Sequence, residues 1–222
     1  MIKVERSYPA PESLAIEAEK ANGSYNLPDV TARLRKDFFD KCYICGIKPM
    51  PDAQVEHRLP HKNNTILGRK YDWDNLFWCC VHCNNVKNKA KYDAGILDCC
   101  KEDPEQFVET VLCDGKVSVT TKGEITPSAT LTAELIYEVF NEMNTGIRTA
   151  ACEVRIHEAQ EEMTKLYRVL AHYRRFTESK QLDCLYLKAL LSRESPFAAI
   201  KRGYIRNHLE EYPELESLLA LK

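Results

Sequence analysis

The chain has 222 residues, of which 44% are hydrophobic and 29% charged, which is ordinary for a globular protein that buries one large core or two smaller ones. No run of about eighteen apolar residues occurs, and the start from Met1 to Arg6 lacks the apolar stretch of a signal peptide, so we expect a cytoplasmic protein without membrane spans. The formal net charge of −2 argues against coating of nucleic acid through bulk positive charge.

Two helices are predicted before the first cysteine pair. Residues 13–19 follow a proline-containing start and end near Asn22-Gly23, which predicts a short helix. Asp29 can cap a second helix, on which Leu34 and Phe38 recur at helical spacing. This second helix leads directly to Cys42.

Four of the ten cysteines form two C-x2-C pairs, Cys42 with Cys45 and Cys80 with Cys83. Each pair can turn two sulfurs toward one ion, and the separation of the pairs is typical of a four-thiolate zinc site. Cys79 is an alternative to Cys80, but only Cys80 repeats the two-residue gap. The metal spacing indicates a reducing compartment, and we expect the other cysteines to be small buried residues.

The order strand, loop, strand, helix is predicted between and after these pairs. Residues 54–59 and 76–79 are strand-like, the polar and basic residues 60–74 join them, and residues 84–91 fit a short polar helix. The zinc ion would fix this unit as a scaffold and would contribute folding free energy on the order of 10 kcal/mol.

Glu56-His57 lies at the end of the first predicted strand. Hydrolysis of a phosphodiester with one metal ion requires a neutral imidazole that takes a proton from water and a hard cation that neutralises phosphate charge. Histidine suits the first role because its pKa is near neutrality. Neighbours on a strand face opposite sides, so the two side chains converge only at a twisted or bulged strand end. An ordinary surface pair is the alternative.

Three asparagines are further candidates. Asn75 precedes the second strand and can hold the loop or orient His57, or it can simply occupy a left-handed turn. Asn84 and Asn88 lie one helical turn apart and face the same side. Together with Glu56 they would offer oxygen ligands, which favours Mg²⁺ or a similar hard ion over a second zinc.

Basic residues gather around this motif, where seven arginines and lysines between Arg58 and Tyr92 stand against two aspartates. Phosphate attraction is therefore expected to be local, although each side chain could equally be solvated surface. The candidate nucleic-acid contacts are Arg58, His61, Lys62, Lys87, Lys89 and Lys91. The histidines of the second half, His157, His172 and His208, are predicted to have no catalytic role.

The second half is predicted to be largely helical. Asp103-Pro104 predicts the start of a helix that runs through Val111, and residues 117–125 predict a hairpin that turns at Gly123 after an entry turn at Asp114-Gly115. Helical periodicity then extends from Thr132 through Met143 and along a long helix to Phe176. The apolar face of that helix is predicted to hold Val154, Met163, Leu166, Leu170 and Tyr173. The last elements are predicted at residues 182–191, after the Ser195-Pro196 cap, and around residues 215–219.

With its parts in this order, the segment from Cys42 to Asn88 resembles the HNH endonucleases, the ββα-metal nucleases, in their zinc-stapled form. The resemblance implies His57 as general base and Glu56 as ligand of a catalytic Mg²⁺ or Mn²⁺ ion. It also implies Asn75 as the residue that orients the hairpin and Asn84 as the closing ligand, with Asn88 as a further candidate. Asn84 departs from the histidine that many members have.

The outer segments resemble the HNH subunit of Septu-type antiphage systems, which are often linked to retrons. These segments are residues 1–6, 9–14, 141–144 and 195–199. The resemblance implies a toxic effector nuclease that acts with an ABC-type ATPase docked on the helical half. DNA is the favoured substrate; the alternatives are RNA, for example tRNA, and a zinc-dependent binding module without catalysis.

The predicted fold is α+β and mostly helical. Residues 1–100 would hold the N-terminal helices and the zinc-stapled ββα core, and residues 101–222 would hold the small hairpin and the helical bundle.

Overall fold

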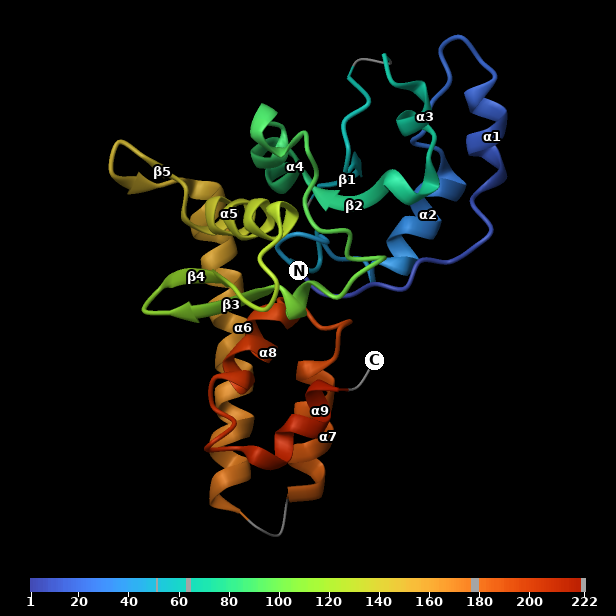
Figure 1. The fold of residues 1–222 in the computed structure, drawn as a ribbon. Coiled ribbons are helices and arrows are strands. Elements are labelled where there is room, and N and C mark those ends of the chain that lie inside the picture. The colour runs from blue at the N-terminus through green and yellow to red at the C-terminus, as the bar shows by residue number, and fades with distance from the viewer. Residues whose placement is uncertain (51, 63–64, 177–179, 221–222) are drawn as a thin grey trace.

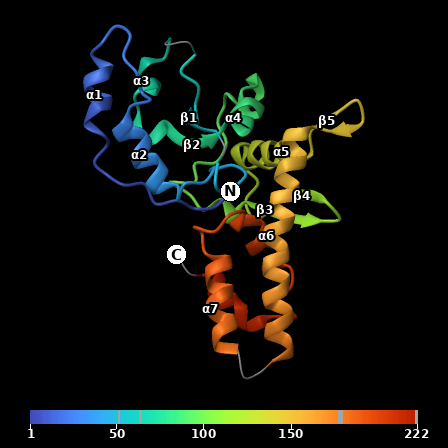
Figure 2. The same cartoon turned by 180° about the vertical axis from the view of Figure 1, so that it is seen from behind.

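The structure is a computed structural model that describes residues 1–50, 52–62, 65–176 and 180–220. About half of the chain is helical, and small antiparallel sheets supply the strands, which confirms the α+β class. Figure 1 shows the elements from α1 (Glu12–Ala18) to α4 (Val81–Lys87) at one end of the molecule and those from α6 (Ala150–Arg175) to α9 (Glu216–Leu219) at the other. Between them lie α5 (Pro127–Asn141) and the hairpin of β3 (Val108–Cys113) and β4 (Lys116–Thr121). The long helix α6 joins the two ends, as the view from behind makes clear (Figure 2).

The ββα unit consists of β1 (Ala53–His57), β2 (Leu76–Cys80) and α4 (Val81–Lys87). The strands are antiparallel, with Ala53 opposite Cys80 and His57 opposite Leu76, so the predicted order of strand, loop, strand and helix is confirmed. Helix α4 begins and ends earlier than predicted: the N–H of Val81 donates to the carbonyl of Asp52 at 3.1 Å, and Asn88 leaves the helical region with ψ at 52°. Residues 63 and 64 of the connecting loop lie outside the described residues.

The N-terminal segment packs onto this unit. Helices α1 (Glu12–Ala18) and α2 (Pro28–Asp37) confirm the two predicted helices, but Leu27 and not Asp29 is at the N-cap of α2. The short α3 (Leu67–Lys70) lies within the loop between the strands. Met1, Ile2 and Val4 are buried. The side chain of Arg6 donates to the carbonyls of Trp73 and Leu76, at 2.8 Å each, and therefore fastens the N-terminus to the start of β2.

The helix predicted from Asp103 through Val111 is wrong beyond its first turn. Asp103 does cap a short 3-10 turn, Pro104–Gln106, but the chain then forms β3 (Val108–Cys113), which pairs with β4 (Lys116–Thr121). Asp114 and Gly115 have φ of 49° and 71°, which suits a two-residue hairpin turn. The hairpin therefore turns at Asp114-Gly115 and not at Gly123. Alternate burial along β3 is the strand periodicity that the helical prediction overlooked.

The remaining elements form the helical region. Helix α5 (Pro127–Asn141) ends before Met143, which lies instead in the tiny hairpin of β5 (Met143–Asn144) and β6 (Ile147–Arg148). Helix α6 (Ala150–Arg175) follows, and its buried face includes Ile156. Val154 lies two residues earlier, on the opposite side of the helix, and is 52% exposed. The prediction that Val154 belongs to the apolar face is therefore wrong. The last helices are α7 (Lys180–Leu191), α8 (Ala198–Arg206) and α9 (Glu216–Leu219).

No helix among the described residues is long and apolar enough to cross a membrane.

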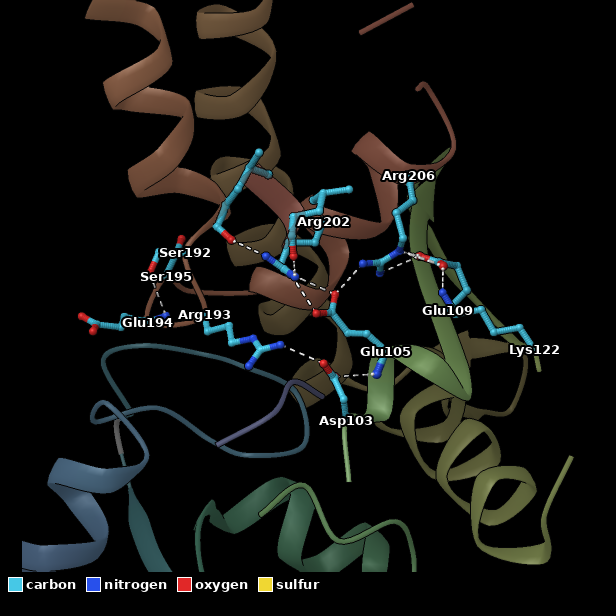
Figure 3. Close-up of polar contacts among 12 residues, drawn as sticks. Asp103, Glu105, Glu109, Lys122, Ser192, Arg193, Glu194, Ser195, Arg202 and Arg206 are labelled. Atoms are coloured by element: carbon cyan, nitrogen blue, oxygen red, sulfur yellow. Dashed lines mark hydrogen bonds and ion pairs between the residues drawn. The ribbon is translucent and has the colours of Figure 1, made fainter. Parts of the chain in front are cut away.

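Helix α8 is fastened to the β3 hairpin by a buried network of charged side chains (Figure 3). Glu105 accepts from Arg202 Nε at 2.8 Å and from Arg206 Nη1 at 2.7 Å. Arg206 also pairs with Glu109 at 2.8 Å. At Gly203 a Cβ atom would lie 2.3 Å from the carbonyl oxygen of Thr110, so only glycine permits this close approach of α8 to β3.

Contacts also join the helical region to the turn that carries Cys42 and Cys45. The N–H of Phe197 donates to the carbonyl of Gly46 at 2.9 Å, directly after Cys45. The buried Lys41 ammonium donates to the carbonyls of Arg193 and Ser195. These contacts hold the helical region against the turn that carries the first cysteine pair.

Candidate active site and zinc centre

The four cysteines of the two C-x2-C pairs converge as predicted. The sulfurs of Cys42, Cys45, Cys80 and Cys83 all lie within 4.8 Å of one another, and all four residues are buried. Cys42 and Cys45 come from the turn that follows α2, Cys80 ends β2, and Cys83 lies in the first turn of α4. The hairpin and the helix therefore meet at this cluster.

This donor set fits zinc. Four thiolates at tetrahedral spacing are the usual ligands of structural zinc, and metal binding keeps them deprotonated. Cys79 Sγ also lies 3.8 Å from Cys42 Sγ, but Cys79 is not one of the four mutually close ligands. The spacing argument that preferred Cys80 over Cys79 thus agrees with the geometry.

His57 lies at the end of β1, where its imidazole is fixed by main chain. Its Nε2 lies 3.0 Å from the carbonyl oxygen of Lys70. A carbonyl can only accept, so Nε2 carries the proton and Nδ1 keeps a free electron pair. The rings of Tyr25 and His61 contact the imidazole edge to face, with centroids at 4.4 Å and 4.6 Å.

The surroundings of His57 keep it neutral. Burial lowers the pKa of His57 to about 4, and the hydrogen bond to the carbonyl of Lys70 opposes this shift. The nearby ammonium groups of Lys87 and Lys70, and His61 when it is protonated, lower the pKa further. The imidazole is therefore unprotonated at neutral pH. Such a group can accept a proton but cannot serve as the cation that binds phosphate.

Glu56 is buried and engaged on both carboxylate oxygens. Oε1 lies 2.6 Å from the ammonium of Lys87, and Oε2 accepts from the hydroxyl of Tyr43 at 2.7 Å. Burial and the charge of Glu56 raise the pKa of Tyr43 well above its ordinary value, so its hydroxyl keeps the proton that it donates. Lys87 also donates to the carbonyl of His57 at 3.0 Å. A positive charge thus already lies between the catalytic candidates.

Oxygen-bearing side chains line one open pocket beside His57. Its lining includes Glu56, His57, Asn84 and Asn88, so the strand end does bring Glu56 and His57 to one cavity. Asn84 uses its amide nitrogen in a 2.9 Å hydrogen bond to Gln54, which leaves its oxygen as the donor for a cation. This carboxylate and amide set fits a hard divalent ion by its chemistry, provided that the ion replaces Lys87 at Glu56.

Asn75 is buried and holds the loop that leaves β1. Its oxygen accepts from the N–H of Leu59 at 2.8 Å, and its nitrogen donates to the carbonyls of Leu59 and Arg69 at 2.8 Å and 2.9 Å. All three bonds go to main chain, so Asn75 holds the loop, and none of these three bonds reaches His57.

The predicted nucleic-acid contacts divide into two groups. His61 and Lys62 line the pocket. Arg58 instead points inward to the carbonyl of Ile96 and to Asp98, and Lys89 pairs with Glu138 at 2.9 Å. Together with the buried Lys87, these are held by protein partners, so much of the positive charge expected around the motif is neutralised within the protein.

Several residues around these sites have no clear signal in the sequence. Tyr25 lies in a loop between two helices, and Asp93 lines the pocket and pairs with Lys62 at 3.5 Å. Arg155 donates to Cys80 Sγ at 3.0 Å. A weak signal exists for Arg155, because it is a charged residue on the apolar face that Cys152, Ile156 and Ala159 define.

The ββα unit and the four converging cysteines both lie within one continuous segment of the chain, from Cys42 to Lys87. Residues 42–90 match the family described as HNH endonuclease, and this match supports a nuclease domain in that segment. A comparison with curated proteins finds no match.

Proposed function

We propose that the protein is a metal-dependent HNH endonuclease that hydrolyses phosphodiester bonds of nucleic acids. The observation that supports this most is the 3.0 Å contact between His57 Nε2 and the carbonyl of Lys70. It leaves Nδ1 of a neutral imidazole as the base that removes a proton from the attacking water. The water oxygen then attacks phosphorus, and the sugar oxygen leaves.

Glu56 and Asn84 would hold the divalent ion, with Asn88 as the further candidate. A bound Mg²⁺ or Mn²⁺ ion supplies charge neutralisation at the phosphate and the leaving oxygen. The zinc held by the four cysteines has a structural role in this proposal. His61 and Lys62 line the pocket and are the proposed contacts to the nucleic acid, since the pair of Lys62 with Asp93 is solvent-exposed. Arg58 and Lys87 are left out because their pairs are buried, and Lys89 because it pairs with Glu138 outside the pocket.

DNA is the proposed substrate, on the strength of the resemblance to HNH endonucleases. RNA cleavage is the alternative, and a zinc-dependent binding module without catalysis is the second one. The phosphodiester backbone is the proposed target, and contacts to phosphate carry no sequence information.

We further propose that the nuclease is a toxic effector of a Septu or retron-associated antiphage system and acts with an ABC-type ATPase. This rests on the resemblance of the outer segments. The helical half supplies exposed apolar side chains for docking, since Leu182, Leu185 and Tyr186 are 52%, 65% and 54% exposed at helical spacing on α7.

The experiment that tests the function incubates the full-length protein, with and without the ATPase, with plasmid DNA and with total cellular RNA. Cleavage is expected to require Mg²⁺ or Mn²⁺ and to stop when EDTA removes the catalytic ion but leaves the zinc bound. Size-exclusion chromatography should show co-migration with the ATPase. No cleavage of either nucleic acid in any arm would support the binding module instead.

The substitution Lys87→Met is expected to change both stability and metal affinity. Without divalent ions, the free energy of unfolding should fall by about 3–5 kcal/mol, because the buried carboxylate of Glu56 loses its positive partner. Added Mn²⁺ should restore much of this loss, because the ion no longer competes with the ammonium. Thermal unfolding with and without Mn²⁺ measures both effects.

The matched control for Lys87 is Lys89→Met, which removes a solvent-exposed ion pair in the next turn of the chain. Its effect should stay below about 1 kcal/mol and should not depend on Mn²⁺. Equal behaviour of the two variants would contradict the proposal that Lys87 and the ion compete for Glu56.

A further inference from the structure

An arginine of the helical region reaches the zinc-binding cysteines. Arg155 lies near the start of α6 and is only 5% exposed. Its Nη2 donates to Cys80 Sγ at 3.0 Å, and its Nη1 donates to the carbonyl of Ala151 at 2.7 Å. Among the described residues, no other charged side chain is found to donate a hydrogen bond to the sulfurs of Cys42, Cys45, Cys80 or Cys83.

The charge of the cluster explains why an arginine is buried here. Four thiolates around Zn²⁺ carry a net charge of −2, which is costly in a buried site unless positive charge lies close by. The Nε atom of Arg155 is buried without a hydrogen-bond partner in the described chain. The guanidinium therefore lies buried with one donor unsatisfied, and its hydrogen bond to the Cys80 sulfur is a charge-assisted one.

The segment of the second cysteine pair, from Cys80 to Cys83, has a second connection to the helical region. His82, between Cys80 and Cys83, has Nε2 at 3.0 Å from the carbonyl of Val139 in α5. Cys152, one turn before Arg155, donates to the same carbonyl at 3.2 Å. The second cysteine pair is thus linked both to α5 and to the first turns of α6.

We propose that Arg155 is a positioning residue of the zinc centre. It donates an N–H to the Cys80 thiolate, offsets part of the cluster charge, and makes the docking of α6 depend on zinc. The zinc ion would then stabilise the packing of the helical region as well as the hairpin of β1 and β2. The inference rests on the structural zinc of the proposed function, and the measurements below separate the two.

The test measures zinc affinity of the full-length protein by competition with a chromophoric chelator. Arg155→Met should raise the zinc dissociation constant by about 10–100-fold, the usual effect of removing a partner of a metal ligand. Arg155→Lys keeps the charge but lacks the planar donor group, so its effect should be smaller and of the same sign. Arg168→Met, at an exposed position of the same helix, is the control and should leave affinity unchanged.

A second readout uses Co²⁺ in place of zinc. The thiolate-to-cobalt absorption band of Arg155→Met should shift relative to the wild type, because Cys80 loses its N–H donor. A role in packing alone would lower the stability of the apo and metal-bound forms equally and move neither the affinity nor this band. Unchanged affinity in both Arg155 variants would overturn the proposal, whereas a wild-type protein that binds no zinc would overturn the zinc site itself.

A measurement on the wild type decides the question if the variants do not fold. Hydrogen exchange of the zinc-loaded protein should show protection of residues 150–159, and zinc removal should reduce it there by more than in α7. Equal loss in both helices, or no loss in residues 150–159, would contradict the coupling.

Discussion

Replacement of His57 by alanine is expected to lower the rate of phosphodiester cleavage by at least 10²–10⁴-fold, the usual contribution of a positioned general base. Nδ1 is the only imidazole nitrogen left to accept a proton, because Nε2 is bonded to the carbonyl of Lys70. The measurement is kcat/KM on the nucleic acid that the wild type cleaves, with zinc content and circular dichroism recorded for each variant.

The control for this substitution is His157→Ala, an exposed histidine on α6 that should leave cleavage unchanged. Unchanged cleavage by a folded, zinc-loaded His57→Ala protein would rule out the assignment of the base.

The pH profile of the wild type provides an independent readout for His57. Burial lowers the pKa of His57 to about 4, and the neutral form is the active base. The acid limb of kcat/KM should therefore lie near pH 4 and not near the ordinary value of about 6.5. In the substrate complex the phosphate charge favours the protonated form, so the limb of kcat should lie at higher pH. An acid limb of kcat/KM at pH 6.5 would argue that His57 is not buried in the free enzyme.

Loss of zinc is expected to unfold the hairpin of β1 and β2. Structural zinc in small modules contributes on the order of 10 kcal/mol, which is comparable to the whole stability of an ordinary domain. The double substitution Cys80→Ser and Cys83→Ser should abolish zinc binding, lower the melting temperature sharply and eliminate cleavage. Metal analysis and calorimetry measure the first two effects.

Two single substitutions, which are expected to keep zinc bound, serve as controls for the double substitution. Cys113→Ser changes an exposed thiol and should alter neither zinc content nor melting temperature. Cys79→Ser should leave zinc bound, because the four mutually close sulfurs do not include Cys79. Zinc loss in Cys79→Ser together with zinc retention in Cys80→Ser would instead move the ligand role to Cys79.

Local patterns predicted the ββα unit well. A C-x2-C pair is a short-range constraint, and two such pairs can satisfy one tetrahedral ion in few ways. The strand that leads to Cys80, Leu76–Cys80, is short, apolar and preceded by a polar loop. The error at Val108 arose where two local signals conflicted, since the Asp103-Pro104 helix start was followed by a strand whose pairing partner decides its conformation.

The sequence by itself determined the cysteine cluster, the order of strand, loop, strand and helix, and the candidacy of His57, because these depend on spacing along the chain. The tertiary structure alone decided which charges are available. The sequence predicts Lys87 as a phosphate contact, but its ammonium pairs with Glu56 at 2.6 Å. Arg155 lies on a helix far along the chain, but its side chain donates to Cys80 Sγ at 3.0 Å. A buried charge takes the nearest opposite partner in space, and that partner is fixed only when the elements pack.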